Sequence, residues 1–184
     1  MLKKYVAILL AFASIDLGLS FDKYTTEILN GNPYNMAIIS SPFIKIHEGY
    51  YYFGQDSVNW YVAYENCRKL GSELVAFESN QEFDAVIGYI RSNLERTKFW
   101  TSGNDLGKTG THKWFSNAQL ININRWAPRQ PDNYKGVEHC IQFGYIYGNS
   151  NDYQLDDNPC SASKNYVCEA PKQETISIVV WKYR

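Results

Sequence analysis

The chain has 184 residues, the length of one compact domain with short tails. Its formal net charge is only -1 and it contains no run of basic residues, which argues against a nucleic-acid-binding surface. Aromatic residues make up 16% of the chain and tyrosine predominates among them, a composition typical of strands and of surfaces that contact polar partners.

Residues 1–20 have the pattern of an export signal. Lys3 and Lys4 precede an apolar stretch from Tyr5 to Ala13, and the small residues Gly18 and Ser20 precede a predicted cut after residue 20. The alternative is an uncleaved anchor or a buried helix. No later apolar run is long enough to span a bilayer, so we expect no membrane insertion. We therefore expect a secreted, extracellular protein.

Export places the four cysteines in an oxidising compartment. Cys67, Cys140, Cys160 and Cys168 form an even set with three possible pairings, and the spacing alone does not choose among them. No pair has the CxxC spacing of a zinc site.

The first elements after a polar N-terminal segment at 21–40 are a strand or hairpin and a helix. Residues 43–53 are rich in Ile, Tyr and Phe and read as the strand or hairpin. Asp56 and Ser57 offer a helix start, and Gly71 a helix end. Between them apolar residues recur at helical spacing: Trp60, Ala63, Tyr64, Cys67 and Leu70.

A second helix and several short strands follow. Ser79 with Glu82 three residues later is a capping-box pattern, and residues 83–90 give the helix one apolar face. Short strands are predicted at 74–77, 99–103, 113–115, 121–123, 140–143 and 165–168. This order predicts an α+β domain over 41–171, with a short tail at 172–184. Long loops between 101 and 160 are the natural place for function.

Five oxygen-bearing side chains lie in and beside those loops: Gln130, Asp132, Glu138, Asp156 and Asp157. Calcium takes six to eight oxygen ligands, and these side chains supply several of them. If the bond before Pro131 is cis, its two neighbours can point toward one centre. The alternative is a solvated acidic loop without a metal.

Several motifs between Phe43 and Pro171 together resemble the C-type lectin-like family, and most closely its small secreted insect members. The motifs are Trp60-x3-Tyr64-x2-Cys67, Phe99-Trp100-Thr101-Ser102-Gly103-Asn104-Asp105, Trp126, Gln130-Pro131-Asp132, Glu138-His139-Cys140, Leu155-Asp156-Asp157-Asn158-Pro159-Cys160 and Tyr166-Val167-Cys168-Glu169. The resemblance implies two helices, two small antiparallel sheets and a long calcium-binding loop region. It also implies the disulfides Cys67–Cys168 and Cys140–Cys160.

The resemblance assigns the Ca²⁺ ligands to Gln130, Asp132, Glu138, Asp156 and Asp157. Gln-Pro-Asp is the order found in the family's galactose binders. In these proteins, two hydroxyls of the bound sugar coordinate the calcium and also form hydrogen bonds with the side chains that hold it. The implied sugar-binding residues are Gln130, Asp132, Tyr134, Glu138 and Asp156. Tyr134 stands where galactose binders often carry an aromatic ring, although it is also readable as an ordinary loop tyrosine.

Three departures from the family pattern affect this expectation. Asp156 replaces the usual Asn, and an ionised Asp accepts hydrogen bonds but donates none. We therefore expect a lower sugar affinity, whereas the added charge favours calcium binding. Thr109, Asn133 and His139 stand where the family's auxiliary calcium site usually has acids, so no well-occupied second site is expected. Thr101-Ser102 replaces an apolar-Gly pair of a core strand.

The function expected from these residues is calcium-dependent binding of galactose-type glycans on glycoproteins or microbial surfaces, with a role in innate defence. Weak single-site affinity would make several copies or multivalent targets useful. A protein-binding module on the same fold is the alternative. We expect no enzyme, since adjacent Asp156 and Asp157 do not give the separated carboxylate pair of a glycosidase. The three histidines, His47, His112 and His139, lack ligand spacing and read as structural or solvated.

Overall fold

The computed structural model describes residues 42–95, 97–145 and 153–172. The predicted export signal, the whole 21–40 segment and all of the C-terminal tail except Lys172 lie outside these residues. Within them, secondary structure follows the order β1 (Ile44–Ile46), β2 (Gly49–Val58), α1 (Trp60–Lys69), β3 (Glu73–Leu74), α2 (Asn80–Asn93), β4 (Lys98–Asn104), β5 (Lys113–Trp114), the 3-10 turn η1 (Tyr134–Gly136), β6 (Cys140–Tyr145), β7 (Tyr153–Asn158) and β8 (Lys164–Glu169).

Hydrogen bonds join the described strands into one mixed sheet in the order β1-β2-β8-β4-β6-β7, with β3 on β8 and β5 on β4. The expected α+β class is confirmed. The two small antiparallel sheets that we expected are continuous here, because β4 and β8 pair in parallel at Phe99 with Asn165 and Trp100 with Tyr166. Every other strand pair is antiparallel.

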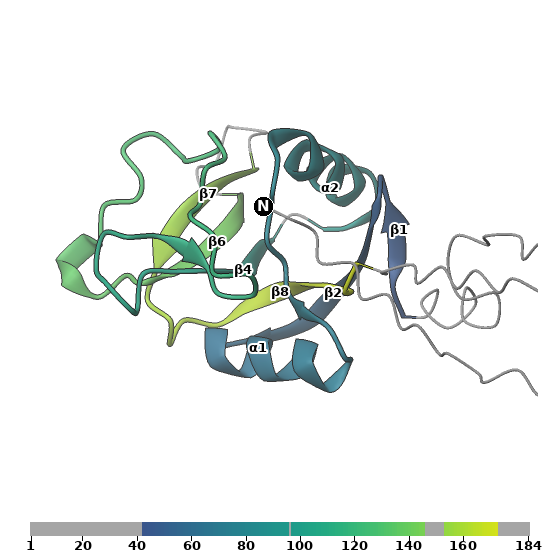
Figure 1. The fold of residues 1–184 in the computed structure, drawn as a ribbon, viewed down its shortest axis with the longest axis horizontal. Helices are drawn as coiled ribbons and strands as arrows, with labels where there is room; N and C mark the ends of the chain where they lie inside the picture. The colour runs from purple at the N-terminus through teal and green to yellow at the C-terminus, as the bar shows by residue number, and fades with distance from the viewer. Residues whose placement is uncertain (1–41, 96, 146–152, 173–184) are drawn as a thin grey trace, which may run out of the picture. The chain divides into compact units, whose positions relative to one another are not determined.

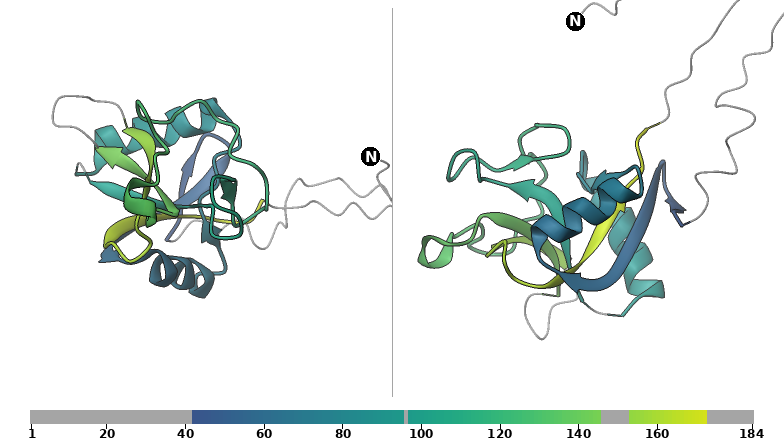
Figure 2. Two further views of the ribbon diagram at one scale, coloured as in Figure 1. Left: turned by 90° about the vertical axis from the view of Figure 1, so that its left-hand side faces the viewer. Right: turned by 90° about the horizontal axis from the view of Figure 1, so that it is seen from below.

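The two helices cover opposite faces of this sheet (Figure 1, Figure 2). On one face α1 packs Trp60, Ala63 and Cys67 against Trp100. On the other face α2 buries Phe83, Val86, Ile87 and Ile90 in a second apolar cluster with Phe143 and Leu155. Neither helix is long and apolar enough to cross a bilayer.

The helix ends follow local rules, with one correction. The α1 N-cap is Asn59, whose side chain accepts from the Val62 amide at 3.0 Å, and not the predicted Asp56-Ser57, because β2 continues to Val58. Gly71 follows the end of α1 with φ of 66°, as predicted. Ser79 caps α2 through the Glu82 amide at 3.1 Å.

The predicted strands near the site differ from the observed ones. Residues 121–123 form no strand, and of 74–77 only Leu74 belongs to one, β3. Conversely, the sequence did not predict β7, where Asp156 and Asp157 lie. Acidic residues are depleted in strands, so local preference gave no signal for β7. Pairing with β6 along six residue pairs holds β7 in place instead.

Both implied disulfides are present. Cys67–Cys168 ties α1 to β8, and Cys140–Cys160 closes the β6–β7 hairpin at its base. By restricting the unfolded chain, each stabilises the fold by about 3 to 5 kcal/mol in the chain-entropy model. The first amide of α1, at Trp60, also donates to the Cys160 carbonyl at 3.0 Å. The loops between β4 and β6 lie at the end of the sheet opposite β1 (Figure 1).

The free energy of unfolding should depend on pH because of one carboxyl group, that of Glu169 at the end of β8. Burial, above all, and the nearby Glu82 carboxylate raise the pKa of Glu169 to about 8. In the unfolded chain the same carboxyl loses its proton near its ordinary pKa. Between these two values the unfolded state holds fewer protons, so the free energy of unfolding falls as pH rises, and levels off above about pH 8.

We predict that Glu169→Gln flattens the fall in the free energy of unfolding between about pH 5 and pH 8, where the wild type loses up to about 1.4 kcal/mol per pH unit. Urea denaturation at a series of pH values measures it. The exposed Glu65→Gln is the matched control and should keep the wild-type slope. If the free energy of unfolding of Glu169→Gln fell with pH as steeply as that of the wild type, the raised pKa of Glu169 would not be the cause of the pH dependence.

Candidate functional site

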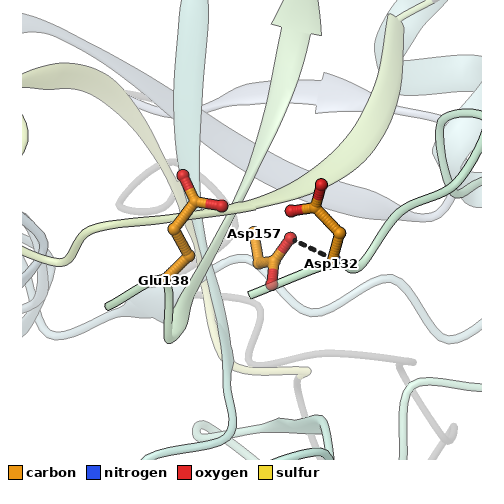
Figure 3. A group of neighbouring side chains, drawn as sticks. All are labelled: Asp132, Glu138 and Asp157. Carbon is orange, nitrogen blue, oxygen red and sulfur yellow. Dashed lines mark hydrogen bonds between the residues drawn. The ribbon is translucent and has the colours of Figure 1, made fainter. Parts of the chain in front are cut away.

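Three carboxylates from separate parts of the chain meet in one place (Figure 3). Asp132 comes from the loop before η1, Glu138 from the segment after it, and Asp157 from β7. One oxygen of each lies within 4.8 Å of the others. Asp132 is exposed, Glu138 is half-buried and Asp157 is buried. These are three of the five predicted metal ligands.

Asp157 fixes the loop to the sheet. Its side chain is 1% exposed, and its two oxygens accept from the Asp132 amide at 3.0 Å and the Asn133 amide at 2.7 Å. The strand partner of Asp157 is Ile141 in the apolar core. The position of Asp132 is therefore set by a carboxylate that is itself held by the sheet.

The turn between Asp132 and Glu138 is closed by reciprocal hydrogen bonds. Asn133, with φ of 44°, accepts from the Glu138 amide through Oδ1 at 3.0 Å. Glu138 Oε2 in turn accepts from the Tyr134 amide at 3.0 Å. These bonds hold the Glu138 carboxylate toward the other two.

The three carboxylates repel one another. The pKa of Glu138 is raised by burial first, then by the charges of Asp157, Asp156 and Asp132, and the bond from the Tyr134 amide opposes this only in part. A cation among these oxygens would remove the repulsion. The donor set is all oxygen, which suits a hard cation such as calcium.

Gln130 lies at the edge of this group. Its Oε1 accepts from the Asp132 amide at 3.0 Å, and the bond from Gln130 to Pro131 is cis, the condition we set for its neighbours to point toward one centre. Its role as a metal and sugar ligand stays a prediction.

Asp156 is directed elsewhere. Neighbouring residues of a strand point to opposite faces, so Asp156 lies on the face of its strand partner Gln142. Gln142 Nε2 donates to Asp156 Oδ2 at 2.6 Å. Burial raises the pKa of Asp156, and the Gln142 bond with the charges of Lys98 and Lys164 opposes that rise. The structure does not place this carboxylate in the three-residue group, and its predicted ligand role remains untested.

Sequence reasoning gave no role to Gln142. It is fully buried, and its Oε1 has no hydrogen-bond partner among the described residues. Only the register of β6 against β7 brings it to Asp156. The one feature of the sequence that could have indicated a buried polar partner here was a glutamine placed between apolar residues in a predicted core strand.

Tyr134 begins η1 and is 60% exposed. The Lys135 ammonium lies 5.2 Å from the centre of its ring. The ring is thus available to a ligand, and its sugar-binding role stays a prediction.

Asp105 organises a second polar group behind the site. Its carboxylate, with a side chain 1% exposed, lies 2.8 Å from His139 Nδ1 and 3.7 Å from His112 Nε2, and accepts from the Gly110 amide at 2.6 Å. His139 is one of the three positions at which we expected the sequence to depart from the family's auxiliary calcium site. The histidines here have the structural role that we expected of them, since they contact a buried carboxylate.

Comparison with known proteins identifies the same family as the sequence motifs. The model of the Lectin C-type domain matches residues 56–170. C-type lectin 37Da of Drosophila melanogaster is 61% identical over 186 residues, covering 99% of this chain and 100% of that protein. The mouse scavenger receptor C-type lectin carbohydrate-recognition domain has a TM-score of 0.61 and 25% identity, covering 74% of this chain and 99% of that one.

A further solved structure supports the fold alone. The C-type lectin CEL-I from Cucumaria echinata has a TM-score of 0.64 at 22% identity, and the match covers 72% of this chain and 97% of that one.

The pairing of Gln142 with Asp156 predicts a linked effect on charge and stability. Gln142→Leu removes the amide donor, so the pKa of Asp156 should rise further, and the free energy of unfolding at neutral pH should fall by about 1 to 3 kcal/mol. Carboxyl NMR titration and urea denaturation measure the two effects. Gln154→Leu, at a half-buried glutamine on β7, the strand that carries Asp156, is the control. An unchanged pKa of Asp156 in Gln142→Leu would contradict the prediction, because the hydrogen bond from Gln142 would then not stabilise the ionised form of Asp156.

Proposed function

The chain belongs to the C-type lectin domain family, and from that premise we propose that it is a secreted, calcium-dependent lectin for galactose-type sugars. Proteins of this family are generally carbohydrate-binding and non-enzymatic. The observation that carries the proposal is the convergence of Asp132, Glu138 and Asp157 next to the Gln-Pro-Asp motif.

The residues present fit a calcium ion. Three carboxylates of differing burial supply oxygens within reach of a single centre, and calcium tolerates such irregular all-oxygen sets. Asp132, Glu138 and Asp157 would hold it, with Gln130 as a further oxygen donor. When bound, calcium would supply coordination positions that sugar hydroxyls fill.

The chain's own side chains would set the choice of sugar. Gln130 offers an amide, which both donates and accepts, whereas Asp132 and Glu138 offer carboxylates, which accept only. This order of amide before acid is the one found in the family's galactose binders. Tyr134 would pack its exposed ring on the apolar face of galactose.

Asp156 supports a second candidate function. An ionised carboxylate has no donor to offer a sugar hydroxyl, and one oxygen of Asp156 already accepts a hydrogen bond from Gln142. A protein-binding module, in which the cation only orders the loops, is consistent with that observation. Where the site does bind sugars, the proposed targets are glycans of microbial or host cell surfaces in innate defence, and self-association is one way to raise weak single-site affinity.

We expect the mature protein to be retained on immobilised galactose in the presence of calcium and released by either a chelator or free galactose. The double variant Gln130→Glu with Asp132→Asn keeps the net charge and the backbone donor at 132 but exchanges acid and amide. It should remain folded, bind calcium and lose retention. Affinity chromatography with calorimetry of the calcium complex checks these outcomes.

A folded, calcium-loaded wild-type protein that flows through would contradict galactose binding and favour the protein-binding module. Retention of the double variant equal to that of wild type would show that the motif does not set the specificity.

Replacing the exposed ring gives a separate test. Tyr134→Ala should weaken galactose binding by about threefold to tenfold, because it removes an aromatic surface, while calcium affinity stays unchanged. Tyr61→Ala, at a tyrosine 51% exposed on α1, is the matched control. Titration calorimetry with galactose measures the change, and equal affinities for the two variants would remove Tyr134 from the proposed site.

A further inference from the structure

A cleft of about 410 Å³ lies between the loop after β4 and the turn after β5. Its lining includes Leu106, Trp114, Phe115 and Ala118. Leu106 is 47% exposed and Phe115 54% exposed, whereas Trp114 is buried at its base. Single exposed apolar residues are common on protein surfaces, but here two large apolar side chains line the same cleft. Contiguous exposed apolar surface of this kind is typical of binding sites. The volume lies in the range of small-molecule sites.

The loop that forms one wall is fixed by hydrogen bonds in the absence of any ligand. The Leu106 amide donates to Asn104 Oδ1 at 3.2 Å, and the Lys108 amide donates to the Asp105 carbonyl at 3.0 Å. Asp105 also accepts from the Gly110 amide at 2.6 Å.

The opposite wall is a tight turn beside β5. The Phe115 amide donates to the Ser102 carbonyl, and the Ala118 amide to the Trp114 carbonyl, at 2.9 and 2.8 Å. Phe115 also packs edge-on against Trp60 and Tyr64 of α1. Both walls are therefore held by hydrogen bonds and packing within the chain, which lowers the entropic cost of binding.

The rim of the cleft is positively charged. Lys108 and Lys113 line it, are exposed, and make no ion pair with any described residue. The acid in the lining, Asp105, has its side chain 1% exposed and faces His139 and His112. The Asp105 carboxylate is thus engaged by the two histidines and by the Gly110 amide and makes no ion pair with either lysine, so an anionic group on a ligand would find two unpaired ammonium groups.

We propose that this cleft is a second binding site, for small anionic amphiphiles that place an apolar body on Leu106, Trp114 and Phe115 and a carboxylate, sulfate or phosphate between Lys108 and Lys113. The volume admits one short acyl chain or ring system and is too small for a helix or a folded partner. The site is separate from the three-carboxylate group, so this proposal stands whether or not the chain binds galactose.

Dodecanoate is a suitable probe, and Trp114 at the base of the cleft is a built-in fluorescent reporter. We expect saturable binding of one dodecanoate per chain, by tryptophan fluorescence and by calorimetry, below the concentration at which the probe forms micelles. A neutral amphiphile with the same chain length, such as dodecyl maltoside, should bind about tenfold more weakly, since it cannot pair with the lysines.

Two double variants separate the apolar and charged parts of the site. Leu106→Ser with Phe115→Ser should abolish dodecanoate binding. Lys108→Gln with Lys113→Gln should weaken it about tenfold and make it equal to that of the neutral probe. Leu70→Ser and Lys45→Gln, at exposed positions outside the cleft, are the matched controls and should bind as wild type does. Near-UV circular dichroism confirms that each variant is folded.

Three results would overturn the proposal. The first is non-saturable binding, and the second is binding that survives Leu106→Ser with Phe115→Ser in a folded protein. The third is equal affinity of wild type for the charged and neutral probes, which would remove the assigned role of the lysines.

Discussion

Repulsion among three carboxylates is the constraint on which the functional end of this molecule depends. Asp132, Glu138 and Asp157 lie close together. Burial first, and then the charges of Asp157, Asp156 and Asp132, raise the pKa of Glu138, and no cationic side chain of the described residues opposes that rise. What holds them together is the backbone: the Asp132 and Asn133 amides donate to Asp157, and the Tyr134 amide donates to Glu138. Calcium is the proposed partner because it supplies the missing positive charge and accepts an all-oxygen set.

The rest of the fold makes that arrangement rigid. Asp157 is carried by β7, which pairs along its length with β6, and the Cys140–Cys160 bond closes the same hairpin. The first amide of α1 donates to Cys160, so the helix on one face of the sheet is tied to the base of the site. A second polar group, in which the buried Asp105 carboxylate contacts His139 and His112, links the loop after β4 to the residue that follows Glu138.

Much of this could be predicted from the sequence, since it depends on local patterns. Helical spacing gave both helices, and the Ser79 cap and the Gly71 end follow from side-chain and backbone chemistry. The disulfide pairing came from family resemblance, because the cysteine spacing left three choices open. The pairing of strands that are distant in the sequence could not be predicted. It joins β4 to β8 in parallel and extends β2 past the predicted helix start. It also brings Asp156 next to Gln142. Two adjacent aspartates look equivalent in the sequence, and only the alternation of β7 sends them to opposite faces.

Titration of calcium into the mature, metal-free protein by calorimetry, with and without galactose, tests whether the three carboxylates hold a calcium ion that also binds the sugar. We expect saturable calcium binding that tightens when galactose is present, because sugar and side chains share the ion, and loss of both effects in Asp157→Asn. Wild-type protein that is folded and takes up no calcium, or that takes it up with the same affinity whether or not galactose is present, would contradict this expectation.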